Sequence, residues 1–545
     1  MRFVHALVAG AVYSELPGRR RRRLHARAAQ VLEKRSGAPA TDLAAQLARH
    51  CALGGLPAEA LRWARRAGDH AADRLSPAEA ARWYRTALGH TAIVEVADHE
   101  RADLLARLGR AQHQINDPAA LATLTEAAAL ARRCGATPIV TQAALATDRG
   151  FLHLGWVPSA QVAIIESALE FIGDGDAATR ARLLALLAEA LPQNTPGTRR
   201  AALAREAIAL ADASPDPALL ARICSSVLFA LWGPSHDATR LRADVARRSI
   251  AAAEAAGDPH LVFAVHAAAY TVAIQLADPA GAARSLERLH VIAEQVGAPG
   301  MIWTVSYYDA FVATMEARFA DAEELMHQAE DAAVAMGAAD SFAVFAGQAA
   351  VLATIAGHHS ELPPNVAQVI EAGPVQPTAA LAHAIISVAS GPREIASDLL
   401  DAAMATGFRG VPADVMWMTS MLGYAILAIE LSDLDAAAQL LAIIEPYAGE
   451  IATNLGPVAA YAGRLASLLG HHDLAERHLS SALEIVETFG WDYHRASVLI
   501  FLAGCRRRRL GELDTQAHAA LDRAARICAA HGLSKLLAAI EDMRR

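Results

Sequence analysis

Residues 255–297 read AAGDPHLVFAVHAAAYTVAIQLADPAGAARSLERLHVIAEQVG, and residues 298–337 read APGMIWTVSYYDAFVATMEARFADAEELMHQAEDAAVAMG. Gly257, Gly297 and Gly337 stand 40 residues apart, each after an apolar run with helical spacing. A glycine in that position is typical of a helix end. Each interval has room for two helices and two short turns. A fixed period of this length with helical patterning predicts a solenoid of stacked helix pairs.

The same signal continues in both directions along the chain, at intervals of 34 to 43 residues. The predicted helix ends are Gly135, Gly173, Ser214, Gly257, Gly297, Gly337, Gly373, Gly407, Gly449, Gly490 and Gly532. Most intervals exceed the roughly 34 residues of a minimal tetratricopeptide repeat, which predicts longer helices. Proline-rich interruptions at 192–197, 233–236 and 362–377 are interpreted as kinks or longer turns within one solenoid.

A tetratricopeptide-like spacing recurs within this period. Gly463 precedes Ala475, Leu479 and Ala482, so that a small residue lies where two helices cross and a larger one fills the gap to the next pair. Related sets are Ala80, Tyr84 and Ala87, and Ala310, Ala322, Met326 and Ala329. We therefore predict an all-α fold, a right-handed solenoid of tetratricopeptide-like helix pairs.

The composition agrees with this interpretation. Hydrophobic residues make up 54% of the 545 residues but aromatics only 5%, so the apolar content is chiefly alanine and leucine, which are strong helix formers. A net charge of −9 is typical of a cytoplasmic protein and argues against a general nucleic-acid binder. Uncharged runs at 259–277 and 341–360 contain His, Gln or Ser and are dominated by alanine, which indicates buried solenoid helices and no membrane segment. The five cysteines are odd in number without a CxxC pair, and are interpreted as buried and reduced.

The N-terminal segment MRFVHALVAGAVYSELPGRRRRRLHARAAQVLEK resembles the winged-helix tail that follows the nucleotide-binding module in bacterial signal-transduction ATPases of the AAA-like or STAND type, and in LuxR-type transcriptional regulators. The matching residues are Phe3, His5, Leu7, Val8, Ala11, Tyr13, Leu16, Pro17, Arg19, Arg20, Leu24, His25, Ala28, Ala29, Leu32 and Glu33. The similarity continues in the first repeats, residues 56–88, and again in residues 457–543. It implies a winged-helix remnant with linking helices at 1–55, followed by a repeat solenoid at 56–545.

Motifs for catalysis are absent from the sequence. Lys34 and Lys535 are the only lysines, and neither follows a glycine, so no GxxxxGK[ST] phosphate loop exists. There is no GxGxxG, GxSxG or HExxH motif. The ExxH pairs ending at His290 and His327 fall at different phases of equivalent helices and are interpreted as surface residues. We therefore predict a protein that is not an enzyme, with no catalytic residues, no cofactor and no metal.

One aromatic cluster offers a candidate binding groove. Thr304, Tyr307, Phe311 and Thr314 lie on one stripe of the helix predicted at 301–318. The equivalent positions of the preceding repeat are smaller, which would leave open space beside the two aromatic rings. Such a groove would accept an apolar side chain of a protein partner or a small effector. The alternative is that these residues are structural packing.

The family resemblance implies a non-catalytic interaction or effector-sensing module of a signal-transduction ATPase or transcriptional regulator. Its partner would be a protein, such as an ATPase module in cis or in trans, or a small effector, without direct contact to nucleic acid or membrane. Arg19–Arg23 would then form either a solvated helix face or a contact with the ATPase module. The alternative function is a free-standing tetratricopeptide scaffold that binds peptides or helices in its groove.

Overall fold

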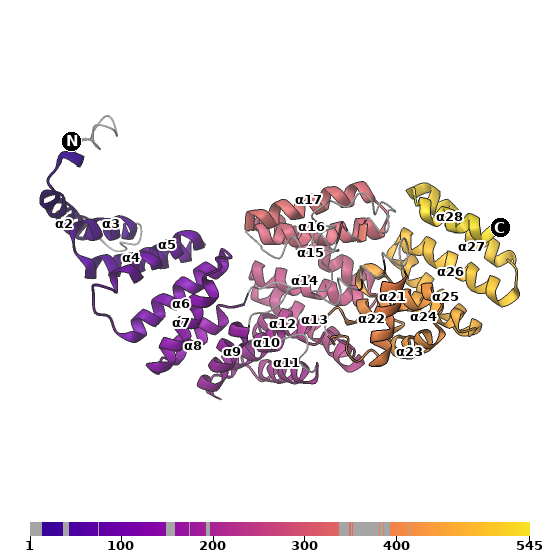
Figure 1. Cartoon of the computed structure of the whole chain (residues 1–545). Coiled ribbons are helices and arrows are strands. Elements are labelled where there is room, and N and C mark those ends of the chain that lie inside the picture. The colour runs from indigo at the N-terminus through magenta and orange to yellow at the C-terminus, as the bar shows by residue number, and fades with distance from the viewer. Residues whose placement is uncertain are drawn as a thin grey trace. The chain divides into compact units, whose positions relative to one another are not determined.

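The computed structural model describes residues 13–35, 43–74, 76–148, 159–173, 175–191, 197–336, 348–349, 351–352, 381, 385, 393–413 and 415–545. Helix makes up 82% of the structure, and these residues contain no strand beyond an isolated bridge between Ile451 and Pro457. Within each unit, helices pack mainly against their neighbours along the chain (Figure 1). The prediction of an all-α solenoid is therefore confirmed. None of the helices in these ranges is long and apolar enough to cross a bilayer.

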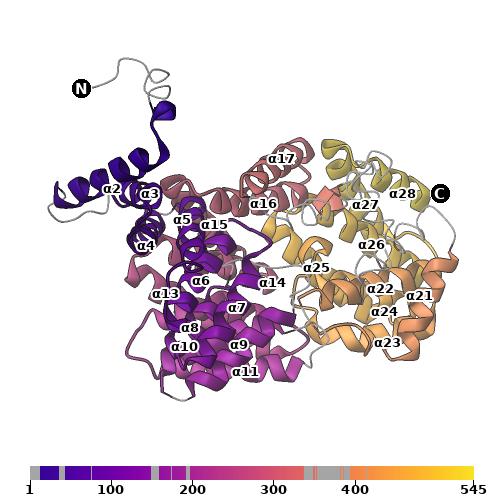
Figure 2. The same cartoon turned by 60° about the vertical axis from the view of Figure 1, so that its left-hand side comes forward.

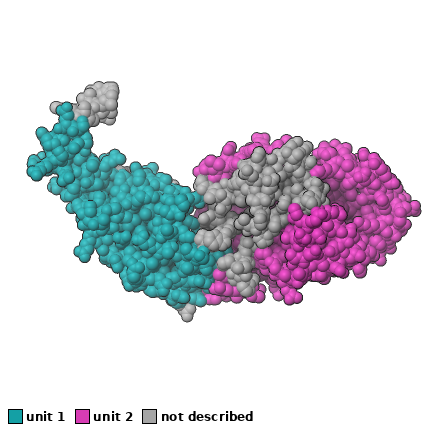
Figure 3. Space-filling model, viewed as in Figure 1, with its two compact units in different colours: residues 1–150, 157–190 teal, residues 151–156, 191–545 magenta. Residues whose placement is uncertain are grey.

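The chain divides into two compact units, coloured separately in Figure 3. Unit 1 holds residues 1–150 and 157–190, and unit 2 holds residues 151–156 and 191–545. The helices of unit 1 are α2 (Gly18–Arg35), α3 (Ala44–Gly54), α4 (Pro57–Asp73), α5 (Pro77–His90), α6 (Asp98–Gln114), α7 (Ala120–Arg133), α8 (Thr137–Leu145), α9 (Ser159–Ile172) and α10 (Ala177–Ala190).

Unit 2 begins with seven helices, of which α13 and α15 end at Gly257 and Gly297, 40 residues apart. Its first helices are α11 (Gly197–Asp212), α12 (Leu219–Ala230), α13 (His236–Ala256), α14 (Pro259–Gln275), α15 (Pro279–Val296), α16 (Pro299–Met315) and α17 (Phe319–Met336). After residues outside the described ranges follow α21 (Glu394–Ala405), α22 (Trp417–Leu431), α23 (Leu434–Ile444), the short 3-10 helices η3 (Glu445–Tyr447) and η4 (Thr453–Leu455), α24 (Val458–Leu468), α25 (His472–Phe489), α26 (Asp492–Leu510), α27 (Thr515–His531) and α28 (Ser534–Arg544).

The division between the two units falls inside the 56–545 repeat region expected from the sequence, whose assignment as one solenoid remains a prediction. It falls at Ala190, directly before the proline-rich 192–197 segment that was interpreted as a turn within one solenoid. At the N-terminus, α2 and α3 occupy most of the part of the 1–55 segment that the structure describes. The winged-helix assignment itself, which also rests on residues 1–12, remains a prediction.

Small residues stand at the helix crossings, as the spacing predicts. A Cβ atom placed on Gly463 would lie 2.7 Å from Cγ of Leu479 and 3.1 Å from the carbonyl oxygen of Ala475. In unit 1, a Cβ atom on Gly68 would lie 2.6 Å from the ring of Tyr84. Only glycine lets the two helices of these pairs approach so closely.

The helix-end glycines are only partly as predicted. Gly257, Gly297, Gly490 and Gly532 adopt the left-handed conformation that ends a helix, with φ between 67° and 73°. Gly449 does not, because α23 already ends at Ile444 and the chain continues through the η3–η4 segment. Gly337 and Gly373 lie outside the described residues. The predicted period is therefore interrupted at Gly449 by an inserted loop.

We predict that Gly463→Ala destabilises unit 2 by about 1–3 kcal/mol, because the added methyl group meets Leu479 and a backbone oxygen in a packed crossing. Gly504→Ala in α26 is the matched control. Its Cβ atom would meet only the flexible tip of Met543, at 3.3 Å, and the gain in helix propensity should leave stability unchanged or raised by up to about 1 kcal/mol. Urea unfolding followed by circular dichroism measures both. Equal midpoints for the two variants would contradict the crossing geometry.

Candidate functional site

The stripe predicted as a groove lies on α16, and its four residues differ in environment. Thr304 and Thr314 are buried, and their hydroxyls donate to the carbonyl oxygens of Gly300 and Ala310 at 2.9 and 2.8 Å. Tyr307 is half-buried and stacks on Trp303, with ring centroids 5.6 Å apart. The hydroxyls of the two threonines therefore bond within α16 and are not available to a ligand. The aromatic residues remain as the candidate contact surface.

Phe311 contacts the C-terminal part of unit 2. Its ring meets the ring of Trp491 edge to face, with centroids 5.7 Å apart and planes at 89°. Trp491, which immediately precedes α26, is only 2% exposed. An aromatic pair in this geometry adds about 0.5–1.5 kcal/mol beyond the burial of its area. One of the two predicted groove aromatics is thus covered by the chain itself.

A hydrophobic cluster surrounds this contact and joins helices that are far apart in sequence. We call it the closure cluster. Figure 2 shows α14 and α16 together with the C-terminal helices that complete it. Its buried members are Tyr270, Ala273, Ile274, Ala282, Met315, Ile451, Val486 and Trp491. In a simple solenoid each repeat contacts only its neighbours, so the closure cluster is a departure from that plan.

Residues 445–457, between α23 and α24, contact α13 and α14 through a backbone hydrogen bond and an aromatic stack. We call this segment the closure loop. The amide of Ile451 donates to the carbonyl oxygen of Gln275 at 2.9 Å. The Tyr447 ring stacks on His236 at the start of α13, with centroids 4.4 Å apart. The loop's short 3-10 turns leave backbone groups free to bond to α14 in place of a continuing helix.

A buried polar chain runs beside these contacts. The Arg242 guanidinium is 1% exposed, donates from Nε to the carbonyl oxygen of Leu228 at 2.8 Å and lies over the Trp232 ring at 4.3 Å. Its Nη1 also donates to Oε1 of Gln275. Nε2 of Gln275 in turn donates to Oε2 of Glu450 at 2.8 Å. The amide of Gln275 therefore connects a buried cation on α13 to a buried carboxylate in the closure loop.

Burial dominates the electrostatics of this chain. It lowers the pKa of Arg242 to about 9, against the attraction of Glu450. It also raises the pKa of Glu450, although Gln275, His236 and Arg242 all favour the ionised form. Both pKa shifts favour the neutral form. For each group, the cost of removing the charge from water is therefore larger than the stabilisation from its hydrogen bonds and neighbouring charges. The polar chain specifies where the closure loop binds, and holding its two charges costs free energy.

His494 supports the closure loop from the other side. Its ring is 7% exposed and packs against Gly456, where a Cβ atom would lie 2.7 Å from the imidazole. Gly456 has φ of 81°, a conformation that favours glycine. Burial lowers the pKa of His494 to about 4, so the ring is neutral at physiological pH. This histidine is a packing residue of the loop.

The remaining sequence candidates lie on surfaces. His290 is exposed and contacts Asp309 at 3.1 Å, whereas His327 is exposed and lies 3.7 Å from Glu330. Among the residues that the structure describes, no group of three or more His, Cys, Asp or Glu side chains is arranged to hold a metal ion. Four cysteines are buried as expected, but Cys134 is exposed at the end of α7, which corrects the prediction for that residue.

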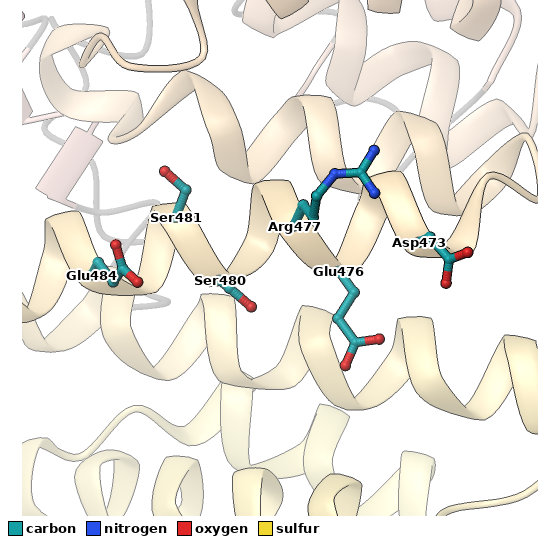
Figure 4. A pocket seen from close by; sticks show the side chains of 6 residues that line it. All are labelled: Asp473, Glu476, Arg477, Ser480, Ser481 and Glu484. Carbon is teal, nitrogen blue, oxygen red and sulfur yellow. The ribbon is translucent and has the colours of Figure 1, made fainter.

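One surface hollow of about 580 Å³ lies along α25. Figure 4 shows its six lining side chains projecting from that single helix. They are Asp473, Glu476, Arg477, Ser480, Ser481 and Glu484. Asp473 and Glu476 are engaged by arginines of α26, with Asp473 2.8 Å from Arg509. The hollow is open, and two of its three acidic side chains are already held by arginines of the neighbouring helix.

Comparison with known proteins identifies no family. No family profile matches the chain, and no curated protein matches it. Among solved structures, 54 chains match. One, described as a "Circular tandem repeat protein with novel repeat topology and enhanced subunit contact surfaces", is 15% identical over 96% of both chains, with a TM-score of 0.15. A TM-score this low carries no argument, so the fold assignment rests on the helix packing itself.

The polar chain is tested by a mutant cycle. Arg242→Met should destabilise unit 2 by about 3–5 kcal/mol, because it leaves the buried carboxylate of Glu450 without its counter-charge. Combining it with Glu450→Gln removes both charges and should recover most of that loss, since the amide oxygen introduced there can still accept from Nε2 of Gln275. Urea unfolding of the single and double variants measures the coupling. A double variant as unstable as Arg242→Met alone would show that the charges do not interact.

The pH dependence of unit 2 should carry a contribution from Glu450. Because its pKa is raised when folded, the folded chain keeps a proton above the ordinary value of 4.5, where the unfolded chain has lost it. The contribution of Glu450 to the free energy of unfolding is therefore fully present below pH 4.5. It is lost as the pH rises through the raised pKa of the folded chain. Wild type should lose stability relative to Glu450→Gln as the pH rises above 4.5 and through this raised pKa. If the free energies of unfolding of the two proteins change in parallel with pH, Glu450 makes no such contribution.

Proposed function

We propose that this chain is a non-catalytic interaction and effector-sensing module of a signal-transduction ATPase or transcriptional regulator. The family context comes from the N-terminal resemblance and the repeat pattern. A helical tandem-repeat fold is itself typical of scaffolds and interaction modules. The observation that carries the sensing role is the closure cluster, in which α14 and α16 bind Ile451 and Trp491 from the same chain.

A sensor needs two states that lie close in free energy. The closed state gains the burial of Trp491 and Ile451, but it also holds Arg242 and Glu450 away from water. Opening would return both charges to solvent and uncover the aromatic face of α16. A ligand that binds this face would favour the open state in proportion to its preference for it. An effector or protein partner with an apolar anchor is the kind of ligand that fits.

The family context is tested through the neighbouring coding sequence. If codons upstream of Met1, or a neighbouring reading frame, encode a GxxxxGK[ST] module, that ATPase is purified and its turnover is measured with and without this chain. A change in turnover and a saturable complex support the regulatory function. If neither reading frame encodes such a module, the free-standing scaffold is favoured.

The contact surface is tested on the complex. Tyr307→Ala should weaken partner binding by about 2 kcal/mol or more, as loss of an aromatic anchor does, and should lower the free energy of unfolding less than Phe311→Ala, because Tyr307 is not part of the closure cluster. Phe311→Ala is the comparison variant, and it should lower the stability of unit 2 because its ring packs on Trp491. Calorimetric titration and urea unfolding separate the two effects. Unchanged affinity for Tyr307→Ala would place the partner elsewhere.

Nucleotide should not bind to the chain itself. The sequence has no phosphate loop and no lysine after glycine to contact a phosphate group. Calorimetric titration of the purified chain with ATP and magnesium should therefore show no saturable heat, and no phosphate should be released. Saturable binding at micromolar ATP would contradict the non-catalytic assignment.

A further inference from the structure

The outward face of α2 concentrates basic charge in a chain that is acidic in total. Its sequence, GRRRRRLHARAAQVLEKR, holds eight arginines and lysines and one acid, whereas the whole chain has a net charge of −9. The acid, Glu33, already pairs with Arg62 of α4 at 2.6 Å. Arg20, Arg23 and Arg27 are exposed. This surface therefore favours an acidic partner.

The arginines destabilise the helix that carries them. The first turn of α2 contains no acidic residue, and a positive charge near a helix N-terminus opposes the helix dipole. Arg19 and Arg23 are also like charges at i, i+4 spacing. An acidic surface packed against this face would relieve both effects. That makes α2 more stable when bound than when free.

Apolar residues lie between the basic ones on the same face. Leu24 and Val31 are 50% and 45% exposed, seven residues apart, while Ala29 on the opposite side is buried in the core of unit 1. With Arg27 and Lys34 they form a stripe at alternating spacings of three and four residues. A stripe that mixes leucine and valine with arginine fits a protein helix better than a phosphate backbone, which would leave the apolar residues in water.

The complementary surface occurs on α17 of the same sequence. This helix, FADAEELMHQAEDAAVAM, contains five acidic residues and no arginine or lysine. Ala322, Met326, Ala329 and Ala333 are buried. The opposite face carries Glu324, Asp331 and Val334, and Val334 is 73% exposed. With His327 between the two acids, these residues form an exposed stripe at spacings of three, four and three that ends in an apolar residue.

We propose that α2 of one copy of this chain packs antiparallel on α17 of a second copy. In that register Leu24 meets Val334, Arg27 meets Asp331 and Lys34 meets Glu324. Val31 then lies beside His327. Each apolar residue of the α2 stripe thus meets an apolar or aromatic one, and the two basic residues of the stripe, Arg27 and Lys34, each meet an acid.

The contact is heterologous, so each copy offers one α2 and one α17, and assembly proceeds to short chains or rings. A single helix pair is smaller than the roughly 1,200–2,000 Å² of a standard stable interface, so association should be weak. It should also weaken strongly with salt, because its charges are exposed.

Sedimentation velocity over a range of protein concentrations tests the proposal. Wild type should show a concentration-dependent rise in sedimentation coefficient at about 50 mM salt that is lost at about 500 mM. The variant Arg20→Glu, Arg23→Glu, Arg27→Glu should remain monomeric, as should Glu324→Lys, Glu330→Lys, Asp331→Lys. An equimolar mixture of the two variants should associate again, because the unchanged α2 of one variant can pack on the unchanged α17 of the other, and the two reversed helices also carry opposite charges. Circular dichroism checks that both variants fold.

The control variant is Arg110→Glu, Arg132→Glu, Arg133→Glu, which makes the same change in net charge at exposed sites of α6 and α7. It should associate as wild type does. The proposal is overturned if wild type is monomeric at every concentration, or if the α2 variant associates like wild type. It is also overturned if the mixture of variants stays monomeric. Binding of duplex DNA by monomeric wild type, lost in the α2 variant, would assign the surface to nucleic acid.

Discussion

The architecture of unit 2 depends on the hydrogen-bonded chain from Arg242 through Gln275 to Glu450. It connects α13 and α14 to a loop 175 residues further along the sequence. A buried charge without a partner costs several kcal/mol, so each end of this chain requires the other. Apolar burial around Trp491 supplies attraction but little direction. The polar chain adds the direction, because its hydrogen bonds are satisfied only when Glu450 stands beside Gln275.

This contact changes the energetics expected of a solenoid. A stack of helix pairs has a stability that is roughly the sum of repeats and nearest-neighbour interfaces, so it can open one repeat at a time. The closure loop and Trp491 add stabilising contacts between distant repeats, and these contacts form or break together. Unit 2 should therefore unfold more cooperatively than a simple stack of repeats. Unit 1 packs helix on neighbouring helix, and its described residues contain no comparable long-range polar chain.

The fold could be predicted from the sequence because its signals are local. Helix-end glycines and the small residue at each crossing, such as Gly463 against Leu479, are set by geometry within one repeat. The site could be predicted only in part. The stripe on α16 was identified, but the partner of Phe311 is Trp491, 180 residues away. Arg242 and Glu450 gave no signal, because nothing in either local sequence indicates which distant residue neutralises a buried charge. The one visible trace was at Gly449, where the expected helix end is replaced by the loop.

The position of the closure cluster connects these observations to the proposed sensing role. Ile451 and Trp491 bind where α14 and α16 present Tyr270, Ile274 and Met315. A ligand for this surface must therefore displace Ile451 and Trp491. Its apparent affinity is lower than its affinity for the open form, because only the open fraction of molecules can bind it. The same competition makes the closed fraction respond to anything that alters the cost of burying Arg242 and Glu450. Binding at α16 and the state of the closure loop are then thermodynamically linked, and each must change the other by the same free energy.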